Sequence, residues 1–124
     1  MVRRSTGDVK RRPNDPPTLI LTSLADGPKH GHALSKDIER FAGVVLGPGA
    51  LYGAITRLEE RGLIEPLESE DRRRPYRITA AGSAYLSDVV AEMRQLADEG
   101  ARRLAEAKNV TAPRRRPRIA GSPA

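Results

Sequence analysis

The 124-residue sequence contains no cysteine, and aromatic residues make up only 3% of it. The absence of cysteine excludes disulfide bonds and thiolate metal sites, and it is typical of proteins in a reducing compartment. No apolar run is long enough to cross a membrane, and the basic start MVRRSTGDVKRRPNDPP lacks the apolar segment of a signal peptide. We therefore expect a cytoplasmic protein with no membrane anchor.

The shortage of large side chains also limits the hydrophobic core. Hydrophobic residues amount to 38% of the sequence, and its length suits one compact domain with an added tail or oligomerisation element. Because tryptophan is absent and other aromatic rings are few, such a domain has a thin core of its own. Burial of apolar surface against a partner chain would add to its stability.

The charge of the sequence is concentrated at its two ends. The net charge is +6, of which residues 1–16 carry +3 and residues 108–124 carry +5, so that residues 17–107 carry −2. Both ends are rich in Pro, Arg, Gly and Ser, which predicts disordered tails. Two interpretations remain open for the tails, an electrostatic clamp on phosphates and a solubilising extension. Bulk charge does not make the central segment a nucleic-acid binder, and a specific pattern is needed.

Two short helices are predicted in the first half of the sequence. The first lies in PPTLILTSLADG, where Pro17 suits a helix start and Asp26-Gly27 suits an end, although its β-branched residues would also permit a strand. The second lies in KHGHALSKDIERFAG and ends at Gly43. Its spacing predicts one apolar core face, formed by Leu34, Ile38 and Phe41.

The third predicted helix lies in LGPGALYGAITRLEERGLIE. Its spacing buries one face, formed by Leu51, Ala54, Ile55 and Leu58, and Gly62 lies where a left-handed C-terminal cap is expected. The start of this helix is unusual because it carries glycines and a proline and almost no side chains. Such a start exposes the backbone N–H groups and lets the backbone approach an anion or a groove wall closely.

A β-hairpin and a long helix complete the predicted order. LIEPLESE and PYRIT read as two short strands joined by the basic turn DRRR, and Thr79 follows as a helix N-cap. Apolar residues then recur at three- and four-residue steps, as in a coiled coil: Leu86, Val89, Met93, Leu96 and, less regularly, Leu104. We expect this seam to pack against a second copy of the chain, with packing inside the monomer as the alternative.

These segments together resemble the PadR-like family of bacterial transcriptional regulators. The resemblance rests on LADGPKHGHALSKDIE, on LGPGALYGAITRLEERGLIE and on DRRRPYRITAAGSAYL. It implies a mainly α (α+β) fold, a winged helix-turn-helix with a two-stranded wing and a long C-terminal dimerisation helix. The expected domains are a winged helix over 17–79 and a dimerisation helix over 80–107, between a tail at 1–16 and one at 108–124.

The resemblance also implies a function. Members of this family act as homodimers on pseudo-palindromic double-stranded DNA operators, mostly as repressors that a ligand or signal releases. We therefore expect a DNA operator, a second copy of the chain and an unidentified small-molecule effector as partners. The sequence departs from the family motifs at three positions on the expected DNA side: His32, Ala50 and Gly53.

The residues expected to meet DNA follow from the buried face of the third helix. Its outward face would carry Gly49, Ala50, Tyr52, Gly53, Thr56 and Arg57. Arg57 is the best candidate for a guanine contact, with an ion pair to Glu60 or to a carboxylate of another element as its alternative. Thr56 suits a base or phosphate, Tyr52 a phosphate and Ala50 a thymine methyl group. In the wing, Arg72, Arg73 and Arg74 would follow the DNA backbone or the minor groove.

The sequence presents no catalytic constellation, so we expect a protein that is not an enzyme and that has no cofactor. Two histidines without cysteine do not predict a metal site. We expect His30 to be structural and His32 to lie at a helix start, within reach of DNA. The alternative function is a winged-helix protein-interaction module whose tails bind nucleic acid nonspecifically.

Overall fold

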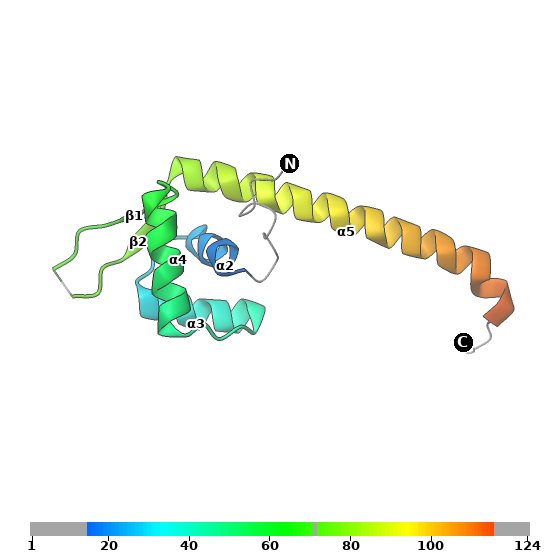
Figure 1. Cartoon of the computed structure of the whole chain (residues 1–124), viewed down its shortest axis with the longest axis horizontal. Coiled ribbons are helices and arrows are strands. Elements are labelled where there is room, and N and C mark those ends of the chain that lie inside the picture. The colour runs from blue at the N-terminus through cyan, green and yellow to red at the C-terminus, as the bar shows by residue number, and fades with distance from the viewer. Residues whose placement is uncertain (1–14, 71, 116–124) are drawn as a thin grey trace. The chain divides into compact units, whose positions relative to one another are not determined.

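The computed structural model of the protein describes residues 15–70 and 72–115, with side chains through residue 109. The expected tails at 1–16 and 108–124 therefore lie in large part outside the described residues. The chain divides into two compact units, one ending at Val90 and the other beginning at Ala91. Its elements are α2 (Pro16–Leu24), α3 (Gly31–Ala42), α4 (Pro48–Glu60), β1 (Ile64–Pro66), β2 (Tyr76–Ile78) and α5 (Ala80–Arg115) (Figure 1).

Helix α2 begins one residue earlier than predicted. The carboxylate of Asp15 accepts a hydrogen bond from the backbone N–H of Thr18 at 3.0 Å, and Pro16 occupies the first helical position. The predicted boundary between tail and domain after residue 16 is therefore too late, because Asp15 and Pro16 form the start of the first helix. The segment is a helix and not a strand, and its apolar residues are buried, including Leu19, Ile20 and Leu24.

The core of the first unit lies where α2 packs against α3 and α4. The predicted core residues of α3 and α4 are buried, namely Leu34, Ile38, Leu51, Ala54, Ile55 and Leu58. The prediction for Phe41 is wrong, since 44% of this residue is exposed. Ala42, Val44 and Leu46 pack against the core at the end of α3 instead, so Phe41 is left at the surface.

The predicted hairpin is confirmed. Strands β1 and β2 are antiparallel, with Ile64 opposite Ile78 and Glu65 opposite Arg77, and the latter two side chains form an ion pair. Lys29, which precedes α3, adds an isolated bridge to Tyr76 through two backbone hydrogen bonds of 3.1 and 2.9 Å. The hairpin is therefore tied to the start of α3 as well as to the end of α4.

A compact junction joins α4 to α5. Thr79 is the N-cap of α5 as predicted, since its hydroxyl oxygen accepts from the backbone N–H of Gly82 at 3.0 Å. The same hydroxyl donates to the carbonyl of Gly62 at 2.7 Å, and Gly62 has the predicted left-handed conformation with φ of 76°. Gly82 is buried, and a Cβ there would collide with the carbonyl oxygen of Leu63.

Helix α5 extends through Arg115, so the expected end of the helix at residue 107 is too early. In the first unit, Leu86 packs against the core and Val89 is only 2% exposed, so these two seam residues lie inside their own chain. Within the described residues, no helix is long and apolar enough to cross a membrane.

Candidate nucleic-acid interface

The start of α3 is organised by two histidines. His30 is the N-cap, and its Nδ1 accepts a hydrogen bond from the backbone N–H of Ala33 at 3.3 Å. His30 thus has the structural role expected from the sequence. His32 is exposed, and its ring stacks on that of His30 with centroids 6.4 Å apart.

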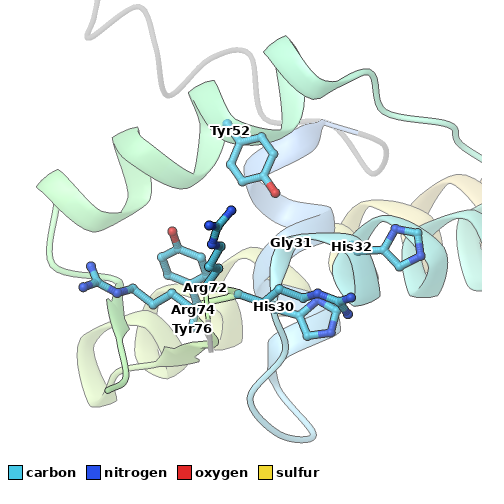
Figure 2. A pocket seen from close by; sticks show the side chains of 8 residues that line it. His30, Gly31, His32, Tyr52, Arg72, Arg74 and Tyr76 are labelled. Carbon is cyan, nitrogen blue, oxygen red and sulfur yellow. The ribbon is translucent and has the colours of Figure 1, made fainter. Parts of the chain in front are cut away.

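A pocket of about 340 Å³ lies where the wing meets the starts of α3 and α4 (Figure 2). It is lined by His30, Gly31, His32, Tyr52, Arg72, Arg73, Arg74 and Tyr76. We call this group the wing pocket. Five of its residues were predicted from the sequence to contact DNA. The pocket concentrates three guanidinium groups, two imidazoles and two phenol hydroxyls, which are the groups that bind phosphate oxygens.

Tyr52 is held in the wing pocket by a glycine. Its side chain extends from α4 toward Gly31 at the start of α3 (Figure 2). A Cβ at Gly31 would collide with the hydroxyl and ring of Tyr52, so only glycine permits this approach. Tyr52 remains 50% exposed. The ring thus lies against the start of α3 while half of the residue still faces solvent.

Tyr76 was not predicted to lie in the candidate site. It belongs to the predicted strand PYRIT, and in the structure it is bridged to Lys29 and lines the wing pocket. Burial raises the pKa of Tyr76 above its ordinary value, and the nearby carboxylate of Glu59 acts in the same direction. Tyr76 therefore keeps its hydroxyl proton well above neutral pH.

The start of α4 is almost bare of side chains, as the sequence indicated. Gly47 is the N-cap and offers no side-chain hydrogen bond, and Pro48, Gly49 and Ala50 are exposed. A Cβ at Gly47 or Gly49 would meet no atom within 4 Å, and neither residue has a positive φ. The packing and backbone of the chain therefore do not require glycine at these two positions.

The outward face of α4 carries few polar side chains. Thr56 donates its hydroxyl to the carbonyl of Tyr52 at 2.9 Å, so this side chain is turned toward its own backbone. Arg57 is exposed, and among residues 15–70 and 72–109 it forms no ion pair. The alternative pairing of Arg57 with Glu60 is therefore absent, and its guanidinium is available to a ligand.

The structure sorts the predicted DNA-binding residues into two groups. His32, Tyr52 and the three wing arginines meet in the wing pocket. The other predicted residues lie along α4 outside that pocket: Gly49, Ala50, Gly53, Thr56 and Arg57. We call the second group the α4 face.

The chain is similar in sequence to a known protein family and to known proteins. The profile of the transcriptional regulator PadR-like family matches residues 20–88. An uncharacterized 37.1 kDa protein in transposon TN4556 of Streptomyces fradiae is 47% identical over 85 residues, which are 68% of this chain and 25% of that protein. The chain thus spans about a quarter of that relative. The transcriptional regulator Rv3488 of Mycobacterium tuberculosis is 40% identical over 86 residues, which cover 64% of this chain and 77% of that protein.

Solved structures agree with the predicted fold. A transcriptional regulator from Clostridium thermocellum has a TM-score of 0.65 at 31% identity and covers 77% of this chain and 96% of its own. A PadR family transcription regulator from Clostridium difficile has a TM-score of 0.65 at 24% identity, covering 71% and 96%. The predicted winged helix-turn-helix with a long C-terminal helix is therefore confirmed.

Proposed function

The chain belongs to the PadR-like family of transcriptional regulators, and from this premise we propose that it is a homodimeric repressor of a pseudo-palindromic operator, released by a ligand or signal. Its winged-helix domain is of the DNA-binding type. The observation that carries the proposal is the wing pocket, which gathers phosphate-binding side chains from the wing, α3 and α4 at one place.

The wing pocket is proposed to bind the DNA backbone. Arg72, Arg73 and Arg74 would contact phosphates or enter the minor groove, while Tyr52 and His32 would bind phosphates beside the recognition helix. These contacts do not depend on the base sequence. They would supply affinity, a strong dependence on salt and the correct orientation of α4.

The α4 face is proposed to enter the major groove and to read bases. Arg57 would donate to the O6 and N7 atoms of a guanine, and Ala50 would contact a thymine methyl group. The exposed first turn at Gly49 would allow the backbone to approach the groove wall closely. Thr56 would contribute through its hydroxyl oxygen while it donates to the helix backbone.

Helix α5 is proposed to form the dimer interface. In the second unit, Leu96 and Leu104 are 76% and 73% exposed, with Met93 as a further seam residue. Ion pairs occupy other positions of the helix, where Arg102 and Arg103 lower the pKa of Glu99. An isolated helix with an exposed apolar seam is marginally stable in water, which favours a second copy as its partner. Two-fold symmetry would place operator half-sites roughly 10 bp apart, or a multiple of this.

The start of α5 does not offer a proposed effector a pair of aromatic rings between which it could stack. Tyr85 is the aromatic residue of this helix, and it packs partly against the core. The guanidinium of Arg61 lies over its ring at 5.1 Å from the ring centroid. We therefore propose an effector or signal that does not insert between aromatic rings of α5.

Selection from random duplex DNA tests the proposed operator. The purified full-length chain is expected to enrich an inverted repeat with two-fold symmetry, and a promoter that carries this repeat is expected to give less transcript when the protein is added. Failure to enrich any motif would contradict the proposal and favour the protein-interaction module instead.

Sedimentation of α5 variants tests the proposed dimer. Leu96→Glu with Leu104→Glu is expected to give a monomer, because both side chains are exposed in the single chain and their replacement leaves its core intact. Gln95→Glu adds a charge at a polar exposed position of the same helix and serves as the matched control. A double variant that remains dimeric would exclude this seam as the interface.

A further inference from the structure

Gly53 lies in the interior of α4, at a position where the chain's own packing does not require glycine. It has no positive φ, and a Cβ there would meet one atom within 4 Å, the Nη1 atom of Arg57 at 3.6 Å. Glycine in a helix interior is destabilising compared with alanine. The chain's own packing therefore leaves room for a side chain at position 53, and what a longer one would meet lies on the outer surface of α4.

The neighbour of Gly53 on that surface is the guanidinium of Arg57. Side chains of an α-helix lean toward its N-terminus, so a residue covers the surface of the turn that precedes it. Arg57 follows Gly53 by four residues and lies over it in this manner. A Cβ at position 53 would just touch the guanidinium at 3.6 Å, whereas a longer side chain would occupy the same space.

Arg57 is also the side chain of the α4 face best placed to use this space. It forms no ion pair among the described residues, while Thr56 is engaged with the helix backbone. The residues of a recognition helix that read bases lie in its N-terminal part. To reach the N-terminal part of α4, the guanidinium of Arg57 has to lie over the surface of Gly53.

We propose that Gly53 is a specificity-determining residue, because its lack of a side chain reserves the surface along which Arg57 reaches its base. The inference rests on the proposed contact between Arg57 and a guanine. A long side chain at position 53 would turn the guanidinium away from the N-terminal part of α4. The base preference would then change at the one position of each half-site that Arg57 reads.

The test compares full-length variants on the selected operator and on its single-base substitutions. The wild type is expected to favour guanine at one position by roughly 5- to 150-fold. Gly53→Ala is expected to retain this preference, because its methyl group only touches the guanidinium. Gly53→Met and Arg57→Ala are each expected to reduce the preference to about twofold or less. The double variant is expected to show no further loss at that position.

Two controls make the outcome decisive. Ala84→Met adds a similar bulk at an exposed position of α5 and is expected to leave all base preferences unchanged. Thermal unfolding verifies that Gly53→Met folds, which is expected because methionine favours helices more than glycine does.

Each remaining outcome contradicts a different claim. If Gly53→Met weakens binding to all sequences equally and the guanine preference persists, the role of Gly53 is overturned while that of Arg57 stands. If Arg57→Ala leaves every base preference intact, the proposed base contact itself is wrong, and the inference about Gly53 fails with it.

Discussion

The wing pocket and the α4 face are built from opposite kinds of residue. The wing pocket brings together arginine, histidine and tyrosine side chains from three elements. The α4 face has glycine and alanine at its start, and Arg57 is its long cationic side chain. Under the proposed function, the wing pocket would supply most of the affinity for DNA, and the α4 face would supply the smaller part of the binding energy that depends on the base sequence.

The largest effect on the affinity for DNA is expected from removal of the wing arginines. Replacement of Arg72, Arg73 and Arg74 by alanine is expected to weaken binding to any DNA on the order of 100-fold at roughly 0.1 M salt, because fewer counterions are released. The slope of log affinity against log salt should become shallower by up to about 3. Titrations at several salt concentrations measure both quantities. An unchanged slope would show that these arginines do not contact phosphates.

The next effect concerns the base contact of the α4 face. Arg57→Ala is expected to cost about 1–3 kcal/mol on the selected operator and much less on unrelated DNA, because a bidentate guanine contact depends on sequence. Competition between operator and random duplexes measures this difference. An equal loss on both DNAs would move Arg57 from the base-reading group to the phosphate-binding group.

A smaller effect is expected from the bare start of α4. Gly49→Ala is expected to leave the free energy of unfolding unchanged or slightly raised, because the added Cβ meets no atom of the chain. DNA binding is expected to weaken by about 1 kcal/mol, roughly fivefold, if the backbone touches the groove wall. Binding and unfolding measurements on the same variant separate the two terms. Binding equal to that of the wild type would show that Gly49 does not approach DNA closely.

The smallest effect is expected from a single hydroxyl group. Tyr52→Phe retains the ring that packs on Gly31 and removes one hydrogen bond, so that affinity should fall about threefold on all sequences. Gly31→Ala is the contrasting variant, because its Cβ would displace the whole ring. A larger loss for Tyr52→Phe than for Gly31→Ala would contradict the role assigned to the ring.

The fold could be predicted from local signals in the sequence. Apolar spacing located the buried faces of α3 and α4, while Gly43, Gly62 and Thr79 marked helix ends that the structure confirms. The prediction of buried residues failed where local spacing alone does not decide which side chain the other elements cover. Phe41 has the right spacing, but Ala42, Val44 and Leu46 pack against the core at this end of α3 and Phe41 stays at the surface.

The candidate site was less accessible to sequence reasoning. The wing arginines and Tyr52 could be named because a charge cluster and a helix face are visible in the sequence. Tyr76 and Gly31 could not be assigned, because their places depend on contacts between distant segments, the bridge of Lys29 to Tyr76 and the approach of Tyr52 to Gly31. Such contacts leave no periodic signal.

The junction at Thr79 has a mechanical consequence. One hydroxyl group binds the end of α4 through Gly62 and the start of α5 through Gly82, and Gly82 lies directly against the backbone of Leu63. These contacts couple the first turn of α5 to the end of α4, so a displacement of one would disturb the hydrogen bonds that hold the other.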